Sequence, residues 1–159
     1  RSFARRGRLD NEQELMGVTS YGPGYGDWTV TKPDHWVFDG TGMKKGDCIP
    51  GLVGWEYHAA PFKEDDKLEV LAQSELHFKS PTRKGNPREN DGSYASVIYP
   101  GPHGNWVFSA STIWWVQGLS NPPGHMPGKA TYGRTQGVDV RVQQITRNLL
   151  NKCIGKKGE

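Results

Sequence analysis

Cysteine is scarce in this chain, and its two cysteines lie far apart in the sequence. Cys48 and Cys153 share no spacing that is typical of metal ligands, so the sequence disfavours a structural zinc site. Neither cysteine lies in the tight strand-to-helix turn that presents a catalytic nucleophile. We therefore expect two free thiols that pack as small apolar side chains, while a single disulfide between them stays open.

Long hydrophobic runs and a strong charge of one sign are also lacking. No apolar run approaches the roughly 20 residues that a membrane-spanning helix needs, and no signal-peptide pattern opens the chain. The net charge is +3, and much of it comes from basic residues near the two ends. The pattern of a nucleic-acid-binding face, with aromatic residues between basic ones, is absent. These absences predict a cytoplasmic protein that binds neither membranes nor nucleic acids.

Glycine, proline and aromatic residues are plentiful. The chain has 21 glycines and 11 prolines against a hydrophobic fraction of 34%, which is typical of a loop-rich globular protein. Six Trp, six Tyr and five Phe supply bulky side chains for a core. We expect a polar arm over residues 1–14, a single α/β domain over residues 15–154 and a tail over residues 155–159. Because the chain begins in an arginine-rich stretch rather than with Met, we expect a processed piece or a fragment of a longer protein.

Hydrophobic periodicity predicts short strands separated by loops. The predicted strands are residues 28–30, 67–74, 93–99 and 106–110. Glycine and proline make residues 15–25 and 118–137 candidate loops, and the polar segment 80–92 is another. Long loops such as residues 118–137 often carry function or subunit contacts.

A helix near the end of the chain is the clearest predicted element. Asp139 is a plausible N-cap, and Gly155 would end the helix. Its apolar face is formed by Val142, Ile145, Leu149 and Cys153. Strands followed by such a helix predict an α/β fold in which the helix covers one face of a sheet.

Residues 51–58 form the segment whose side chains are best suited to catalysis. Gly51 and Gly54 allow the backbone to turn or to approach another group closely, and Glu56 follows Trp55 directly. A carboxylate beside an indole and an apolar core would be partly desolvated, which raises its pKa and suits it to proton transfer. The alternative is a strand-end glutamate that caps a loop or pairs with a lysine or arginine.

Two histidines are candidate catalytic groups. None of the five histidines has another at the helical i, i+4 spacing, so the sequence contains no local metal signature. His35 and His58 both follow aromatic, strand-like runs, and they could meet at one edge of a sheet. The alternative for each is a hydrogen-bonded structural histidine.

Two hydroxyl residues follow the predicted strand at residues 106–110. Ser111 and Thr112 lie where α/β proteins gather ligands, which makes them candidate substrate-binding residues. The alternative is a turn that leads to a buried aromatic pair, Trp114 and Trp115.

Three stretches together resemble one known family. They are residues 51–56, the glycine, strand, hydroxyl turn and tryptophan block at 104–119, and the helical block at 140–150, which contains Ile-Thr-Arg-Asn-Leu-Leu. Together they resemble the C-terminal region of the N,N-dimethylformamidase large (beta) subunit family. The resemblance extends roughly from Asp34 to Leu150, and the first thirty residues match less clearly.

The resemblance implies a fold and a chemistry. The fold would be part of a class I glutamine-amidotransferase-like (flavodoxin-like) three-layer domain, with a largely parallel sheet and flanking helices. That fold's cysteine nucleophile is absent in the formamidase branch, as it is here. The enzymes hydrolyse small N-substituted formamides to formate and an amine. They use a mononuclear iron that two tyrosines and a glutamate hold upstream of the matched region, so no iron ligand is expected in this chain.

The resemblance also bears on the candidate residues and on partners. Glu56 matches a glutamate that faces the family's active site, so we expect it to be catalytic, with Trp55, Ser111 and Thr112 near the substrate. His58 has no secure counterpart. Because the family's subunit is several times longer, we expect a larger chain that carries the upstream metal-binding domain.

The alternative hypothesis is that the chain is not catalytic. In it the chain is a binding or assembly subunit of a larger complex. A surface formed by Trp114, Trp115 and Tyr132, together with the loop at residues 118–137, would then dock the partner.

Overall fold

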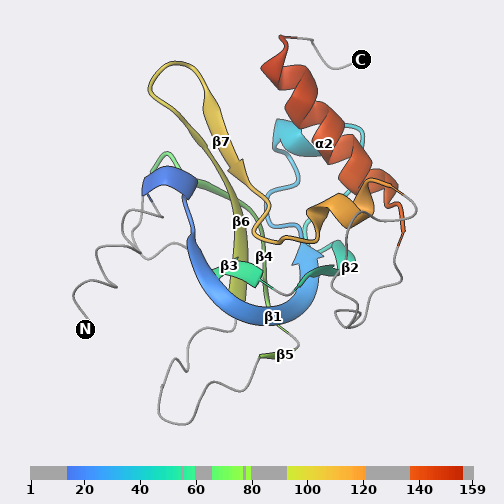
Figure 1. The fold of residues 1–159 in the computed structure, drawn as a ribbon. Helices are drawn as coiled ribbons and strands as arrows, with labels where there is room; N and C mark the ends of the chain where they lie inside the picture. Colours follow the sequence, from blue (N-terminus) through green and yellow to red (C-terminus); the bar gives the residue numbers. More distant parts are fainter. Residues whose placement is uncertain are drawn as a thin grey trace, which may run out of the picture.

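The computed structural model of the chain describes residues 14–54, 56–59, 66–76, 78–79, 93–120 and 137–155. In this part the fold is mixed α/β, with a seven-stranded sheet and an α-helix beside it (Figure 1). The strands are β1 (Thr19–Thr29), β2 (Cys48–Val53), β3 (Glu56–Ala59), β4 (Glu69–Glu75), β5 (Phe78–Lys79), β6 (Ser93–Pro100) and β7 (Trp106–Ser109). The helices are the 3₁₀ helices η1 (Trp36–Phe38) and η2 (Trp115–Gly118) and the α-helix α2 (Val140–Cys153).

Each of the strand pairs in the described part is antiparallel. The strand order is β2-β1-β3-β6-β4, with β5 paired to β1 and β7 paired to β6. This corrects the expectation of a largely parallel sheet for these residues. Parallel neighbours need a crossover connection, usually a helix, whereas here strands such as β6 and β7 are joined by a short turn.

Strand β1 is long and strongly bent, and it joins the two sides of the sheet (Figure 1). One end pairs with β3 and the other with β2, and the register shifts between Ser20 and Pro23 and again between Gly26 and Trp28. At Gly24, an added Cβ would lie 2.6 Å from Leu76 and 2.8 Å from the Tyr57 ring. The prediction of a loop over residues 15–25 is therefore wrong for β1. Glycine permits the close approach, and Pro23 lies beside a register shift, where a regular ladder is interrupted.

The core lies between the sheet and the C-terminal helix. Trp28 at its centre is fully buried, and its ring lies 5.9 Å from Phe38 of η1 and 5.4 Å from Trp115. The predicted helix is confirmed, because Asp139 caps α2 and accepts a hydrogen bond from the Arg141 N–H. Its buried residues are Val142, Ile145 and Leu149.

The predicted strands are present with shifted ends, and one predicted packing contact is wrong. Cys153 was expected on the apolar face of the helix, but it is exposed at the end of α2, beyond the reach of the core. Cys48 is half-buried, and both thiols are free. The expected loop at residues 80–92 and most of the loop at residues 118–137 lie outside the described residues, as do most of the expected arm and tail. No described helix is both long and apolar enough to cross a membrane.

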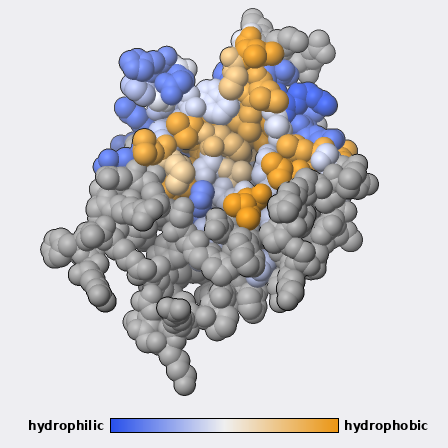
Figure 2. Space-filling view, in the orientation of Figure 1, coloured by the Kyte–Doolittle hydropathy of each residue, from blue (hydrophilic) through white to orange (hydrophobic). Residues whose placement is uncertain are grey.

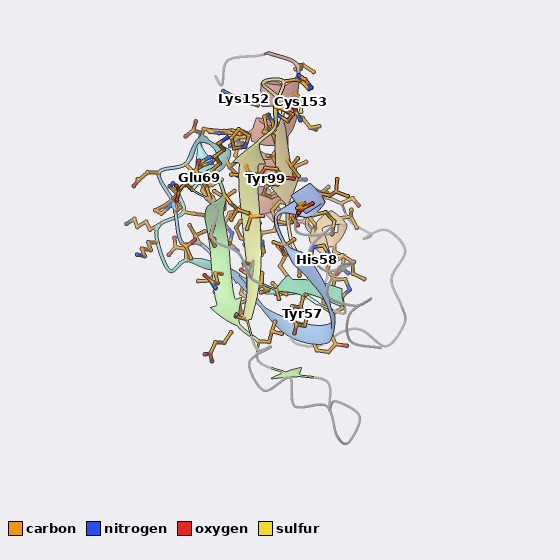
Figure 3. The ribbon with its side chains drawn as sticks, turned by 90° about the vertical axis from the view of Figure 1, so that its left-hand side faces the viewer. Tyr57, His58, Glu69, Tyr99, Lys152 and Cys153 are labelled. Atoms are coloured by element: carbon orange, nitrogen blue, oxygen red, sulfur yellow. The ribbon has the colours of Figure 1, made fainter. Side chains whose placement is uncertain are left out.

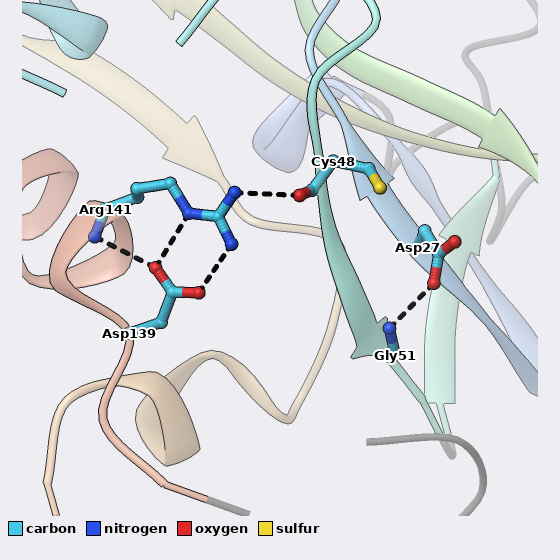
Figure 4. A network of polar contacts seen from close by, with 5 residues as sticks. All are labelled: Asp27, Cys48, Gly51, Asp139 and Arg141. Carbon is cyan, nitrogen blue, oxygen red and sulfur yellow. Dashed lines mark hydrogen bonds and ion pairs between the residues drawn. The ribbon is translucent and has the colours of Figure 1, made fainter. Parts of the chain in front are cut away.

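An ion pair at the start of α2 ties the helix to β2 (Figure 4). Arg141 donates to both carboxylate oxygens of Asp139, at 3.0 and 2.8 Å, and its Nη1 donates to the Cys48 carbonyl at 2.9 Å. Burial raises the pKa of the Asp139 carboxyl, but the hydrogen bonds and charge of Arg141 outweigh it, so the net pKa lies below its ordinary value. The ionised form of Asp139 is therefore favoured by folding.

Asp139→Asn should make the protein less sensitive to acid. A lowered pKa in the folded state means that stability from this group is present above the unfolded pKa and is lost as pH falls through the folded pKa. Asparagine keeps the N-cap but has no charge to lose. The free energy of unfolding, measured with urea, should fall more for the wild type than for the variant as pH falls below about 4.

The exposed Asp34→Asn is the matched control, and it should leave the acid dependence as in the wild type. An Asp139→Asn protein with the full acid dependence of the wild type would contradict this account of the helix cap.

Candidate functional site

Two glycines frame the end of β2: Gly51 lies within the strand and Gly54 directly follows it. Gly51 has a left-handed backbone, with φ of 62°, and its N–H donates to Asp27 Oδ1 across the β1–β2 pair at 2.8 Å (Figure 4). At Gly54 an added Cβ would lie 2.2 Å from ring carbons of Trp114. The left-handed backbone of Gly51 accompanies the register shift of the β1–β2 pair, and the missing side chain of Gly54 allows the indole ring to lie against the backbone. The close approach is as the sequence predicts for this pair, whereas Gly51 lies in a strand and not in a turn.

The main catalytic candidate lies directly after this frame. Glu56 begins β3, where its backbone pairs with Pro23 of β1. Its side chain and the whole of Trp55 lie outside the described residues, so their roles remain predictions.

Thr112 fastens the turn after β7 to the frame. Its Oγ1 donates to the Leu52 carbonyl at 2.8 Å and accepts hydrogen bonds from Gly54 N at 3.2 Å and Trp114 N at 3.1 Å. Thr112 also forms an isolated antiparallel bridge with Tyr57 of β3. The hydroxyl of Thr112 is thus used by three main-chain groups, which fixes the turn against both strands.

Ser111 has an unusual backbone in the same turn. Its φ of 59° is the only left-handed value among the described residues other than glycine, and its side chain is 2% exposed. Such a conformation persists only where the surroundings hold it. Here the Ser111 hydroxyl donates to the Ala95 carbonyl of β6, and the Ser111 carbonyl accepts from the His58 N–H at 3.2 Å.

The structure brings His58 and Ser111 together through a serine that sequence reasoning missed. His58 Nδ1 lies 3.3 Å from Ser109 Oγ, which in turn lies 3.4 Å from Ser111 Oγ. Ser96 on β6 adds a third hydroxyl, which donates to the Ser109 carbonyl at 2.7 Å. A local signal for Ser109 existed, since residues 109 and 111 are two apart at a strand end, but their meeting with β3 depends on non-local pairing.

His35 belongs to a different place in the fold. Its Nδ1 accepts from the Val37 N–H at 3.3 Å, which caps η1, and its Nε2 lies 3.8 Å from Glu69 Oε1. Burial lowers the pKa of His35 below its ordinary value, and Glu69 opposes this only in part. Figure 3 shows Glu69 well apart from Tyr57 and His58. The expectation that the two histidines meet is therefore not met, and His35 has the geometry of a structural cap.

The predicted aromatic surface is largely buried. Trp114 is 2% exposed and lies 5.6 Å from the Tyr25 ring, and Tyr132 lies outside the described residues. Trp115 packs on Trp28, and its Nε1 donates to Thr146 of α2 at 3.0 Å. Hydrophobic side chains instead reach the surface along α2 and beside η2, on the face shown in Figure 2.

One buried polar atom close to the frame has no hydrogen-bond partner among the described residues. It is the indole Nε1 of Trp114. Buried donors are normally paired, so this N–H is a donor that a ligand or another part of the protein could use.

The described part of the chain contains no cluster of common metal ligands. There, no three His, Cys, Asp or Glu side chains come close enough to one another to hold a metal ion. These residue types therefore supply no iron site in the described part of the chain.

Gly54→Ala should destabilise the fold by about 1–3 kcal/mol, because the added methyl group would overlap the Trp114 ring. In a Trp114→Leu background the ring is gone, so the same substitution should cost clearly less. Urea unfolding of both single variants and the double variant measures this coupling.

Gly42→Ala is the control: a Cβ there meets nothing within 4 Å, so the cost that its left-handed backbone (φ 69°) causes should be the same with and without the Trp114 ring. Additive free energies for Gly54→Ala and Trp114→Leu would mean that Gly54 is needed for a reason other than the ring.

Comparison with known proteins gives a family but no individual relative. Residues 1–129 match the family model described as N,N-dimethylformamidase beta subunit-like, C-terminal. The match takes in the first thirty residues, which the resemblance covered less clearly, and it ends before α2. No curated protein and no solved structure matches the chain. Because the match covers most of its length, the chain belongs to the N,N-dimethylformamidase beta subunit-like, C-terminal family.

Proposed function

We propose that this chain is the C-terminal chain or fragment of an amidohydrolase similar to N,N-dimethylformamidase. Its reaction would be the hydrolysis of a small N-substituted amide to an acid and an amine. Membership of the family over residues 1–129 is the observation that carries this proposal. The glycine frame, with Trp114 and Thr112 fixed against it, supports the placement of a reactive segment at the start of β3.

Glu56 is the proposed catalytic carboxylate. It would orient or deprotonate the attacking water, or protonate the leaving amine. Trp55 is proposed to contact the substrate. Ser111 and Thr112 would act beside it by holding the turn, because their hydroxyl protons already go to the carbonyls of Ala95 and Leu52.

The iron that the resemblance implies would be held by a larger partner chain. No three His, Cys, Asp or Glu side chains in the described part of the chain could hold it, and the resemblance implies ligands in an upstream domain. The glutamine-amidotransferase-like three-layer fold is likewise proposed for the complete domain, to which this antiparallel sheet would belong. Two free thiols suit the reducing environment of the cytoplasm, where we place the enzyme.

The alternative is a non-catalytic binding or assembly subunit. The observation that favours it is the exposure of apolar side chains at η2 and at the start of α2. Ile113 is 45% exposed, Val116 is 52% exposed and Val140 is 73% exposed. Apolar groups gathered in this way often mark contacts with another protein.

Glu56→Gln separates the two functions. In the complex purified from its source, the wild type should hydrolyse small N-substituted formamides, measured as released formate and amine. Loss of this carboxylate, whether it orients the water or transfers a proton, should lower kcat by about 100-fold or more, while assembly with the partner stays unchanged. The exposed Glu75→Gln on β4 is the matched control and should keep full activity.

Unchanged turnover in Glu56→Gln would remove the catalytic assignment of this residue. A wild-type complex with no activity on any amide would instead favour the assembly subunit.

A further inference from the structure

A series of hydroxyl contacts holds the ring of His58. His58 is half-buried in β3, and its Nδ1 lies 3.3 Å from Ser109 Oγ. Ser109 Oγ lies 3.4 Å from Ser111 Oγ, and Ser111 Oγ donates to the carbonyl of Ala95. The series therefore runs from an imidazole through two buried serines to a main-chain carbonyl on β6.

The number of available protons determines which group donates in each of these contacts. A carbonyl oxygen can only accept, so the single hydroxyl proton of Ser111 goes to Ala95. Ser111 must then accept in its contact with Ser109, which uses the single proton of Ser109. Ser109 can only accept from His58, so the ring nitrogen that faces it, Nδ1, carries a proton.

The opposite direction leaves one contact without a proton. If Ser109 donated to His58 Nδ1, the oxygens of Ser109 and Ser111 would face each other with lone pairs only. Ser109 is 9% exposed and Ser111 is 2% exposed, so water cannot easily compensate there. Buried polar groups are nearly always paired, which favours the arrangement that satisfies every contact.

Two further contacts fix the serines in place. The Ser96 hydroxyl donates to the carbonyl of Ser109 at 2.7 Å, and the Ser111 carbonyl accepts from the His58 N–H at 3.2 Å. The left-handed backbone of Ser111 aims its hydroxyl at β6 while its carbonyl faces β3. Uncommon backbone geometry of this kind is concentrated at functional sites.

We propose that Ser109 and Ser111 hold His58 in the tautomer protonated at Nδ1, so that Nε2 carries the lone pair and serves as the proton acceptor in amide hydrolysis. The role in hydrolysis rests on the function proposed above, whereas the tautomer does not. Any group that contacts Nε2 therefore meets a hydrogen-bond acceptor. Ser109 and Ser111 are positioning residues in this account, and His58 is the group that moves the proton.

In the proposed step, His58 accepts a proton from water and then passes it to the leaving nitrogen. Water, oriented by the Glu56 carboxylate, forms a bond from its oxygen to the amide carbonyl carbon as His58 Nε2 takes one of its protons, and the carbonyl π electrons move to oxygen. When the intermediate collapses, the C–N bond breaks and the leaving nitrogen receives the proton from Nε2. The products are the carboxylic acid and the amine, and His58 returns to its starting tautomer.

The tautomer can be read directly by ¹⁵N NMR of the full chain at alkaline pH, where the imidazole is neutral. We expect the signals of a protonated Nδ1 and an unprotonated Nε2 for His58. Ser109→Ala should shift the population toward Nε2–H, and Ser109→Thr, which restores a hydroxyl, should reverse this change. Ser74→Ala, whose hydroxyl bonds to the Asp27 carbonyl at 2.8 Å, is the control and should have no effect. A wild-type His58 protonated at Nε2 would overturn the proposal.

The proton-transfer role needs a separate variant in the active complex. His58→Asn keeps a side-chain N–H near the place of Nδ1 but has no base at Nε2, so kcat should fall about 100-fold or more with KM and assembly retained. Wild-type kcat in this variant would overturn the role of His58 as proton acceptor. If no amide is hydrolysed by the wild type, the proposed function fails while the NMR result still decides the tautomer.

Discussion

Backbone pairing along β1 is the constraint on which the rest of the structure depends. One end of this bent strand pairs with β3, where Ser20 lies opposite His58, and the other pairs with β2, where Gly26 lies opposite Val53. The short connection between β2 and β3 is thereby held on both sides. The indole of Trp28 in β1 also donates to the Ala110 carbonyl at 3.2 Å, which fastens the turn after β7.

Close packing then converts this frame into a defined site. The turn after β7 can approach the β2–β3 connection only because residue 54 has no side chain, and the hydroxyl of Thr112 bonds both partners once they are close. The end of β7 and this turn place Ser109 and Ser111 against His58. Each hydrogen bond contributes modestly, about 0.5–1.5 kcal/mol, but together they remove the freedom of the turn.

Local patterns in the sequence predicted the elements that depend on local rules. The helix face of Val142, Ile145 and Leu149 and its cap at Asp139 follow from spacing and side-chain chemistry alone. The strand through residues 19–25 was missed because glycine and proline normally indicate a turn, whereas here they permit bending and close contact. The direction of strand pairing could not be predicted from local patterns either, because antiparallel pairing depends on partners elsewhere in the chain.

The candidate site was predictable in part for the same reason. His58, Ser111 and Thr112 were singled out from their positions at strand ends, and the structure places them in one cluster of contacts. Ser109 was not, although it lies two residues before Ser111, because its contact with His58 depends on how β3 and β7 each pair with β6. His35 was included on a similar local pattern, yet its partners are the η1 backbone and Glu69.

Native mass spectrometry with metal detection, on the protein as purified from its source, tests the central claim most directly. The account predicts a complex between this chain and a larger, iron-bearing chain, as expected for one part of an amidohydrolase. A free and metal-free species of 17.7 kDa would contradict it.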